Sequence, residues 1–312
     1  MKAAYVFEKV KKMIADKNYR TIAFARLGWY NKLSDEEFIK KIFEPSLGYP
    51  INLEDPKSYS EKLQWLKLHD RNPAYTMMVD KATAKEYISG IIGEKYVIPT
   101  LGVWDRFDDI DFSKLPDQFV LKCTHDSGGI VICKDKNNFD IAKARKVIET
   151  GLKKSFYYFG REYPYKDVKH RIIAEKYMED SAVHELRDYK FFTFNGKVKA
   201  LFVAADRQTK GKPTTFDFFD ENYNHLPIKQ GHPNAAKVPD KPVCFDEMKT
   251  LAEKLAEGIP HVRVDFYEVN GNVYVGELTF YHFSGFTPFV PQEWDYKFGE
   301  WLDLTPLKTA NR

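Results

Sequence analysis

Hydrophobic residues recur at helical spacing in four parts of the chain, and this pattern predicts helices there. The four parts are residues 1–75, 75–93, 140–156 and 245–259. In the first part, Ser58 and Glu61 have the S-x-x-E spacing of a capping box, which predicts that a helix begins at this point. The last part has a continuous apolar face, formed by Phe245, Met248, Leu251, Ala252, Leu255 and Ile259.

Short apolar runs rich in β-branched and aromatic residues predict strands. They cover residues 96–104, 117–125, 127–135, 170–180, 189–207 and 261–280. The run 189–207 is expected to be a hairpin that turns at Asn195-Gly196. Clusters of strands interrupted by single helices are typical of α+β subdomains rather than of a regular doubly wound sheet.

The last hairpin, "HVRVDFYEVNGNVYVGELTF" (261–280), carries charges where a strand usually buries apolar residues. A two-residue loop at Asn270-Gly271 would place Asp265 and Glu277 on opposite faces. A three-residue loop over 269–271 changes the parity and separates the two kinds of residue. One face then holds Val262, Val264, Phe266, Tyr274, Leu278 and Phe280, and the other holds Arg263, Asp265, Glu277 and Thr279. Because this separation is clean, we expect the three-residue loop.

Two interpretations of the charged face stay open from the hairpin alone. The first is a solvated surface with a cross-strand pair between Arg263 and Glu277, which is worth roughly 0.2–1 kcal/mol. The second is a Mg²⁺ site in which Asp265 and Glu277 hold the metal against nucleotide phosphates, while Arg263 stabilises developing anionic charge.

Composition is that of an ordinary globular protein. The 312 residues are 43% hydrophobic and 30% charged, which is enough for two or three subdomains. Three cysteines without metal-ligand spacing are expected to be free thiols in a reducing compartment. The first twenty residues contain no apolar signal-peptide region, and the longest uncharged run, 278–292, is too short to cross a bilayer. We therefore expect a cytoplasmic protein.

The net charge of +3 is unevenly distributed, because residues 1–41 contain ten Lys and Arg against five Asp and Glu. This segment could lie on an anionic membrane surface or a glycolipid, or it could be a helical arm packed on its own domain. No basic stripe continues along the rest of the chain, so nucleic-acid binding is not expected.

Two further segments suggest nucleotide chemistry but are weak signals on their own. In "FVLKCTHDSGGIVIC" (119–133), a strand carrying Lys122 precedes Ser127, Gly128 and Gly129, whose backbone N–H groups could close over phosphate oxygens. An ordinary hairpin turn with a chance lysine is the alternative. The strand in 172–180 leads into Glu175, Lys176, Tyr177 and Met178, which could be either an adenine-binding connector or an ordinary strand end.

The order of these features along the chain resembles the ATP-grasp superfamily. The segments "EKLQWLKLHDRNP", "VDK", "FVLKCTHDSGG", "IIAEKYMED", "DYKFFTFNGKVK", "VRVDFY" and "GELTFYHFSGF" are more closely similar to the TupA-like ATP-grasp family, over roughly residues 50–303. The resemblance implies an α+β ATP-grasp fold with two subdomains that clasp ATP. We expect a helical N-terminal region (1–75), a smaller lid subdomain (76–177) and a larger subdomain with the Mg·ATP carboxylates (178–312).

The resemblance also implies roles for individual residues. Phosphate binding falls to Lys81, on the helix predicted over 75–93, and to Lys122, Ser127, Gly128 and Gly129. Glu175, Lys176, Tyr177 and Met178 frame adenine, and Asp188 holds the ribose. Asp265, Glu277 and Thr279 bind Mg²⁺, and Arg263 is the catalytic cation. Ligases of the superfamily usually have Asn at the position of Thr279, so a second Mg²⁺ is expected to be held more loosely.

The activity implied by the resemblance is the ATP-dependent joining of a carboxylate and an amine through an acyl phosphate. Family context suggests a saccharide carboxylate, such as a uronic acid of a bacterial surface polysaccharide, and an amino acid or other small amine. The alternative is a glycosyltransferase, which would need a D-x-D motif such as Asp109-Ile110-Asp111. His125, beside the glycine loop, could contact phosphate or substrate, and His282 could contact substrate or replace a family proline.

Overall fold

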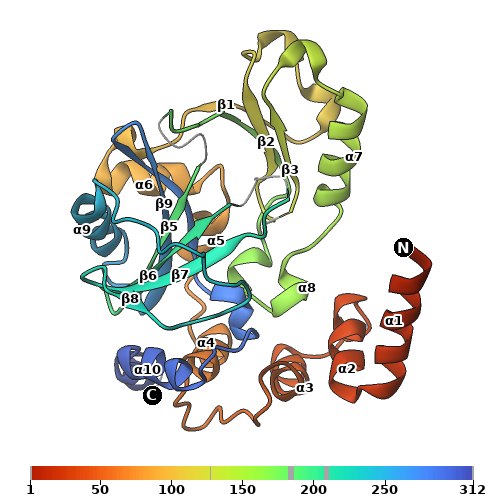
Figure 1. Ribbon diagram of the computed structural model, residues 1–312, viewed down its shortest axis with the longest axis vertical. Coiled ribbons are helices and arrows are strands. Elements are labelled where there is room, and N and C mark those ends of the chain that lie inside the picture. Colours follow the sequence, from red (N-terminus) through yellow and green to blue (C-terminus); the bar gives the residue numbers. More distant parts are fainter. Residues whose placement is uncertain (1, 127, 182–185, 207–210, 311–312) are drawn as a thin grey trace.

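The computed structural model describes residues 2–126, 128–181, 186–206 and 211–310, which form two antiparallel sheets with helices around them (Figure 1). The helices are α1 (Lys2–Ala15), α2 (Lys17–Arg26), α3 (Asp35–Leu47), α4 (Tyr59–His69), α5 (Ala74–Val79), α6 (Ala84–Ile92), α7 (Ile141–Leu152), α8 (Tyr157–Gly160), α9 (Phe245–Leu255), α10 (Glu293–Trp301) and α11 (Thr305–Ala310). The strands are β1 (Thr100–Trp104), β2 (Phe119–Cys123), β3 (Ile130–Cys133), β4 (Ile172–Lys176), β5 (Asp188–Phe194), β6 (Lys197–Ala205), β7 (Thr215–Asp220), β8 (His225–Leu226), β9 (His261–Val269) and β10 (Asn272–Thr279). The expected α+β class is confirmed.

The larger sheet has the strand order β10-β9-β5-β6-β7-β8 and is covered on both faces near its centre. Side chains alternate between faces, so Phe191 and Phe192 of β5 point in opposite directions. Phe191 packs against Phe245 of α9, with ring centroids 5.7 Å apart, while Phe192 packs against Tyr59 of α4 and Phe298 of α10. All seven residues of β5 are buried, so any polar side chain on this strand needs a partner inside the protein.

The smaller sheet has the order β1-β4-β2-β3, and α7 covers one of its faces (Figure 1). Phe119, Leu121 and Cys123 of β2 join a core with Ala144 and Ile148 of α7. Lys122 therefore points to the opposite face. Because side chains alternate along β2, Lys122 lies on the face of the smaller sheet that α7 does not cover, although its neighbours in the sequence are apolar.

The helix predicted over 75–93 is wrong as a single element, because the chain turns between α5 and α6. In the turn, the Asp80 carboxylate accepts a hydrogen bond from Ala82 N at 2.8 Å, and Lys81 N donates to Thr124 O at 3.0 Å. A short acidic side chain that bonds to nearby backbone competes with helix formation. Lys81 consequently lies in a turn that touches the smaller sheet, and not on a helix.

The expected loop of the last hairpin is also wrong. Asn272 pairs with Val269, so the loop has two residues, Asn270 and Gly271, both with positive φ. The register then shifts at Gly276, between Val275 and Glu277. This bulge restores the parity that the loop does not provide, because an extra residue in one strand turns all later side chains to the other face.

The charged face of the hairpin therefore forms as expected, although a two-residue loop and a bulge produce it instead of a three-residue loop. Glu277 lies opposite Asp265, and Thr279 lies opposite Arg263. The expected apolar face is correct apart from Tyr274, which pairs with Tyr267 on the other face. Before the bulge, the positions that pair toward the core are Val273 and Val275, both of which are buried.

Strands β7 and β8 were not expected from the sequence. Asp217 interrupts the apolar run of β7, yet it is fully buried, and its carboxylate accepts a hydrogen bond from Ala235 N at 3.0 Å. A buried acidic residue is tolerated only when such partners satisfy it, and the partners come from a distant part of the chain.

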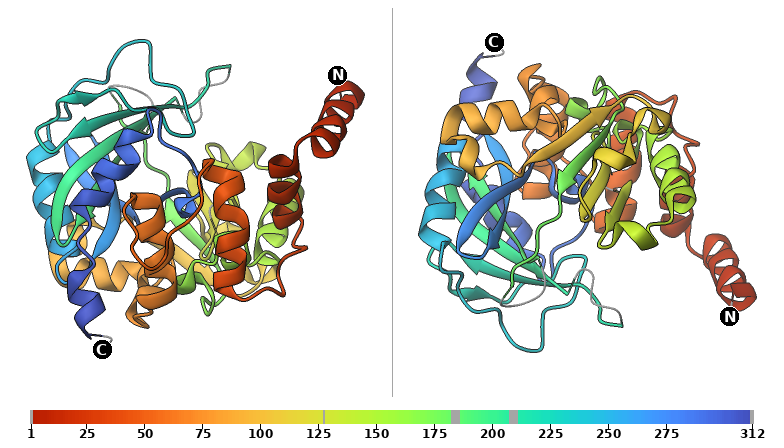
Figure 2. Two further views of the ribbon diagram at one scale, coloured as in Figure 1. Left: turned by 90° about the horizontal axis from the view of Figure 1, so that it is seen from below. Right: turned by 90° about the horizontal axis from the view of Figure 1, so that it is seen from above.

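The N-terminal region is helical, as expected, but its helices differ in their environment. The capping box of α4 is present, and Leu63 and Leu66 join the core of the larger sheet together with Met78 and Ile88 of α5 and α6. In contrast, α1 and α2 project away from the two sheets (Figure 2). Among the described residues, no helix is long and apolar enough to cross a membrane. The subdomain boundaries at 75 and 177 stay predictions.

Candidate active site

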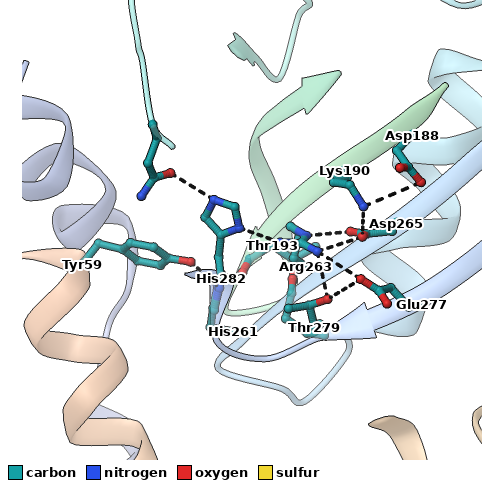
Figure 3. A network of polar contacts seen from close by, with 12 residues as sticks. Tyr59, Asp188, Lys190, Thr193, His261, Arg263, Asp265, Glu277, Thr279 and His282 are labelled. Carbon is teal, nitrogen blue, oxygen red and sulfur yellow. Dashed lines mark hydrogen bonds and ion pairs between the residues drawn. The ribbon is translucent and has the colours of Figure 1, made fainter. Parts of the chain in front are cut away.

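Three neighbouring strands of the larger sheet place polar side chains in one row. Lys190 of β5 lies opposite Asp265 of β9, and Asp265 lies opposite Glu277 of β10 (Figure 3). One step along the strands, Arg263 lies opposite Thr279. Side chains directly opposite one another in an antiparallel sheet are within interaction distance. Residues separated by up to 87 positions in the sequence, Lys190 and Glu277, are thereby brought to one place.

Arg263 is the centre of this cluster, and its side chain is only 8% exposed. Its Nε and Nη2 atoms donate to the two carboxylate oxygens of Asp265 at 2.6 and 2.8 Å, a bidentate arrangement. Nη2 also donates to Thr279 Oγ1 at 3.0 Å and to Glu277 Oε1 at 3.3 Å. The guanidinium is therefore fixed in orientation by three side chains from two strands.

His282 holds the remaining side of Arg263. Since arginine can only donate, Arg263 Nη1 donates to His282 Nδ1 at 2.5 Å, which places the imidazole proton on Nε2. Nε2 then donates to Gln230 Oε1 at 3.0 Å, and Gln230 donates to Thr287 O. Burial, together with Arg263, lowers the pKa of His282 well below its usual value, in agreement with a neutral ring. His282 is buried, so it positions Arg263 in this structure.

Lys190 is a member of the site that the sequence reasoning missed. Its ammonium donates to Asp265 Oδ2 and lies 3.7 Å from Asp188 Oδ1. Asp188, the predicted ribose ligand, is fully buried beside it. The alternation rule could have found Lys190, because it follows Asp188 by two positions on a strand and so shares its face.

The pKa of Glu277 is set by the cations that surround it. Burial works to raise the pKa of Glu277, but Lys190, Arg263 and Lys81 together outweigh it and hold the pKa far below the usual value. The side chain is nevertheless 42% exposed, in contrast to Asp265 at 1%. Glu277 is therefore an ionised carboxylate that a ligand can reach.

The smaller sheet contributes a second cluster of charge. Lys122 of β2 and Lys85 of α6 each lie 2.6 Å from one oxygen of Glu175 of β4. Burial raises the pKa of Glu175, but the two lysines outweigh this effect and lower it to about 2. The predicted phosphate lysine and the predicted adenine residue are thus paired with each other in this structure.

Lys81 links the two clusters. Its ammonium donates to the carbonyl oxygen of Asp126, just before the glycine loop. Burial lowers the pKa of Lys81. The negative charge of Glu277 acts to raise this pKa, and the positive charge of Lys122 acts to lower it. A small cavity of ≈ 20 Å³ lies here, and Lys81, Lys85, Glu175, Gly276 and Glu277 are among the residues that line it. Lys81, from the turn between α5 and α6, and Glu175, from the smaller sheet, thus meet Glu277 of the larger sheet at this cavity, and Lys122 is paired with Glu175 beside it.

The glycine loop is held by its own acidic residue. Gly129 N donates to both oxygens of Asp126, at 3.1 and 3.0 Å. A side chain at Gly129 would lie 2.6 Å from Cys123 Sγ, so the close approach requires glycine. At Gly128 a Cβ would meet nothing within 4 Å. Ser127 lies outside the described residues.

The other predicted adenine residues lie at the edge of the smaller sheet. Lys176 and Tyr177 line an open hollow of ≈ 750 Å³ together with Gln118 and Lys134. Lys134 lies 5.3 Å from the centre of the Tyr177 ring, and Tyr177 OH donates to Glu179. Met178 is half-buried. These residues are near one another, but their roles toward adenine stay predictions.

His125 is buried. Its Nε2 lies 3.0 Å from Lys154 O, and its ring stacks on His170 with centroids 3.5 Å apart. The structure therefore gives His125 a packing role between the end of β2 and the segment after α7. The contact with phosphate or substrate considered from the sequence stays a prediction.

The donors present fit a Mg²⁺ ion that is shared with a bound phosphate. Among the residues that the structure describes, no group of three or more acidic, histidine or cysteine side chains could hold a metal by itself. Asp265 and Glu277 are adjacent hard oxygen donors, and Mg²⁺ is commonly held by one or two carboxylates plus substrate phosphates and water. The Thr279 hydroxyl, 3.3 Å from Glu277 Oε1, is close enough to contribute.

Comparison with known proteins identifies the family of this chain. Residues 61–303 match the family described as TupA-like ATPgrasp. The chain belongs to the TupA-like ATP-grasp family. The match confirms the family expected from the sequence motifs, and with it the ATP-grasp fold. No curated protein matches the chain.

Several solved enzyme structures resemble the TupA-like chain at low identity. The D-alanine–D-alanine ligase from Bacillus anthracis has 18% identity and a TM-score of 0.42, with 75% of this chain and 68% of that chain covered. The structure of this ligase in complex with ATP has 14% identity and a TM-score of 0.38, with 65% of this chain and 54% of that chain covered. The chain therefore spans about half the length of that structure. The D-cycloserine synthetase DcsG has 14% identity and a TM-score of 0.41, with coverages of 72% and 69%.

Proposed function

We propose that this TupA-like protein is an ATP-dependent carboxylate–amine ligase. ATP phosphorylates a carboxylate, an amine displaces phosphate from the acyl phosphate, and the products are an amide, ADP and phosphate. The observation that supports this most is the convergence of Lys81 and Lys122 from one side with Arg263, Asp265 and Glu277 from the other. Phosphoryl transfer needs positioning and charge neutralisation more than covalent chemistry, and this cluster supplies both.

Each side chain has a defined task in the proposal. Lys81 and Lys122 provide positive charge to the phosphate oxygens, which requires Lys122 to exchange Glu175 for phosphate. Arg263, held by Asp265 and His282, stabilises charge on the transferred phosphoryl group. Asp265 and Glu277 would hold Mg²⁺, which would neutralise the nucleotide's phosphate charge. Asp265 would then have to exchange part of its contacts with Arg263 and Lys190 for the metal.

The remaining assignments complete the nucleotide site. Ser127, Gly128 and Gly129 cover the phosphates, Asp188 binds the ribose, and the connector formed by Glu175, Lys176, Tyr177 and Met178 frames adenine. Thr279 completes the metal ligands. The support for these roles is the family resemblance of the motifs that contain these residues.

The acceptor proposed is a carboxylate of a bacterial surface polysaccharide or its precursor, such as a uronic acid, joined to an amino acid or another small amine. The basis is the family resemblance and not a substrate pocket. The use of ATP would place the reaction in the cytoplasm, with the acceptor in its cytoplasmic, unassembled form.

The glycosyltransferase alternative finds no support in the structure. Asp109 pairs with exposed Arg106 at 2.7 Å, and Asp111 caps Ser113 N within the same surface segment. A D-x-D motif that binds a sugar nucleotide needs carboxylates free to hold metal, and these two carboxylates serve local turns.

Calorimetry with Mg·ATP and with a panel of UDP-, GDP- and CMP-sugars tests the proposal. Binding of Mg·ATP alone is expected, and the double variant Lys81→Met/Lys122→Met should lose it. An exposed-lysine pair, Lys114→Met/Lys237→Met, is the matched control and should bind ATP normally. Binding of a sugar nucleotide without ATP would overturn the ligase assignment.

A further inference from the structure

The N-terminal arm, defined here as residues 2–32 with α1 and α2, combines exposed apolar side chains with strong positive charge. It contains eight Lys and Arg against Glu8 and Asp16, a net charge of +6, whereas the whole chain carries +3. The net charge of the arm thus exceeds that of the whole protein, and the rest of the chain has a net negative charge.

The apolar side chains of the arm are unusually exposed. Among the described residues, the large hydrophobic side chains that are more than 60% exposed are Phe7 (64%), Ile14 (74%), Leu27 (67%), Trp29 (68%) and Val243 (91%). Four of these five lie in the arm, which is about a tenth of the chain. Single exposed hydrophobic residues are normal, but such a concentration marks an interaction surface.

The arm does not bury this surface against its own protein. None of the described side chains of α1 or α2 is buried, and α1 projects beyond the body of the molecule (Figure 2). Arg20 Nη1 donates to the carbonyl oxygens of Met13 and Ile14, which fastens α2 to the end of α1. The sequence-based alternative, an arm packed on its own domain, holds for part of residues 1–41, because α2 contacts α3 and Phe38 and Ile39 of α3 are buried. It does not hold for α1 or for the exposed apolar side chains of the arm.

Cations lie directly beside the aromatic rings. Lys11 Nζ lies 5.5 Å from the centre of the Phe7 ring, and Lys12 Nζ lies 4.9 Å from that of Tyr19. Trp29 stacks on Phe24 with centroids 4.3 Å apart. Phe7 and Ile14 are seven positions apart on one helix and so share a face. Lysines that flank apolar and tryptophan side chains are typical of helices that lie in an anionic lipid interface.

We propose that residues 2–32 dock this protein on a membrane surface that contains anionic lipid. The apolar side chains enter the boundary between headgroups and acyl chains, and the lysines and arginines neutralise the headgroups. A second copy of the chain is a poorer occupant, because two arms of charge +6 repel each other.

Docking of the arm would also orient the candidate active site. Arg161, which is buried, donates to the carbonyl oxygens of Tyr30 and Asn31 at 2.9 and 3.1 Å. The next residue, Glu162, accepts a hydrogen bond from Ser284, which lies shortly after β10. Hydrogen bonds through Arg161 and Glu162 thus connect the end of the arm to the segment that follows β10, the strand that carries Glu277. A docked arm would therefore hold the candidate active site at a fixed distance from the lipid surface.

Co-sedimentation of the full chain with vesicles tests the proposal. Binding is expected to vesicles of equal parts phosphatidylcholine and phosphatidylglycerol, and not to phosphatidylcholine alone. Replacing Lys11, Lys12 and Lys17 with Gln should weaken binding by about a hundredfold. Replacing Lys57, Lys114 and Lys237 with Gln removes three exposed charges elsewhere and should leave binding unchanged.

The apolar contribution is tested separately. The double variant Phe7→Ser/Trp29→Ser should abolish binding, while Val243→Ser, the matched exposed control, should not. Anionic vesicles should shift the tryptophan emission of the wild type to shorter wavelength, and Trp29→Leu should remove the shift.

Equal binding to both vesicle types, or no binding, would overturn the proposal. So would an arm-dependent dimer in analytical ultracentrifugation that the Phe7→Ser/Trp29→Ser variant abolishes. ATP binding is measured in the same samples, because it should be unchanged in every arm variant. Failure of membrane docking is thereby distinguished from failure of the nucleotide site.

Discussion

At the scale of single residues, the site depends on charges that neutralise one another inside the protein. Arg263 and Lys190 share the buried carboxylate of Asp265, while the more exposed Glu277 remains accessible. A buried charge that loses its partner is costly, whereas an exposed one is not. Asp265 is therefore expected to contribute more to folding than Glu277, whose lowered pKa still means that its ionised form stabilises the folded state.

Glu277→Gln is expected to lower turnover by roughly a hundredfold or more, because an electrostatic contact at the transition state is worth about 3 kcal/mol. It should also reduce the free energy of unfolding, because the lowered pKa of Glu277 means that its ionised form stabilises the folded state. Asp265→Asn should lower turnover similarly and also reduce the free energy of unfolding. Amine-dependent ADP release and urea unfolding measure the two effects. Asp246→Asn, whose side chain is 88% exposed, is the control. Wild-type turnover in both site variants would show that this face is only a polar surface.

Thr279→Asn tests the departure from the usual ligase pattern. An amide oxygen is a better ligand for Mg²⁺ than a hydroxyl, so this variant should keep activity and reach half-maximal rate at lower Mg²⁺. The measurement is ADP release against Mg²⁺ concentration. Loss of activity would indicate instead that the hydrogen bond from Arg263 to Thr279 Oγ1 is what matters at this position.

At the scale of elements, the ion pairs of Glu175 join β2, β4 and α6. The pKa of Glu175 is lowered to about 2, from an ordinary value of 4.5. A depressed carboxylate pKa stabilises the folded state above pH 4.5, and this stabilisation is lost as the pH falls toward 2.

Lys122→Met is therefore expected to reduce the free energy of unfolding by about 1–3 kcal/mol at neutral pH. The difference from wild type should shrink between pH 4.5 and 2, as Glu175 becomes protonated. Denaturant unfolding across this range measures it. Lys197→Met, which breaks an exposed pair with Glu253, should cost only about 0–1 kcal/mol. A difference that did not change with pH would contradict the assignment to Glu175.

The bulge at Gly276 decides which way Glu277 points. Deleting Gly276 should turn Glu277 and Thr279 away from Asp265 and Arg263 and abolish activity. A side chain at this position would lie 2.8 Å from the Tyr267 ring, so Gly276→Val should also destabilise the fold by about 1–3 kcal/mol. Gly90→Ala, where a Cβ meets nothing within 4 Å, is the control. Turnover and thermal unfolding are the measurements, and an active deletion variant would refute the register argument.

At the scale of the whole molecule, nucleotide binding should hold the two sheets together. Lys81 and Lys122 belong to the side of the smaller sheet, whereas Asp265 and Glu277 belong to the larger one, and a single ATP would contact all four. A ligand that binds only the folded state stabilises it according to its concentration relative to Kd.

Saturating Mg·ATP, at about 100 times Kd, should therefore stabilise the wild type by about 2.7 kcal/mol. Differential scanning calorimetry measures the corresponding rise in Tm. The Lys81→Met/Lys122→Met variant should show no rise, whereas Lys114→Met/Lys237→Met should behave as wild type. An equal rise in all three proteins would mean that ATP binds elsewhere.

The sequence by itself determined the α+β class, the family and most individual elements, because these depend on local periodicity, capping and short motifs. The capping box at Ser58 and the amphipathic face of α9 are examples: neighbours along the chain are enough to specify them. The gathering of Arg263, Asp265, Glu277 and Thr279 on one face was also legible from the alternation of side chains.

Tertiary structure decided what local patterns cannot encode. The two-residue loop and the bulge at Gly276 form together. This combination buries Val264 and Leu278 on one face of the larger sheet and leaves the charged side chains on the other face. Alternation places Lys190 on the same face as Asp188, but only strand pairing brings it opposite Asp265, and only the folded chain brings His282 into contact with Arg263. Such contacts link strands that are far apart in the sequence, and their energy exists only once the sheet has formed.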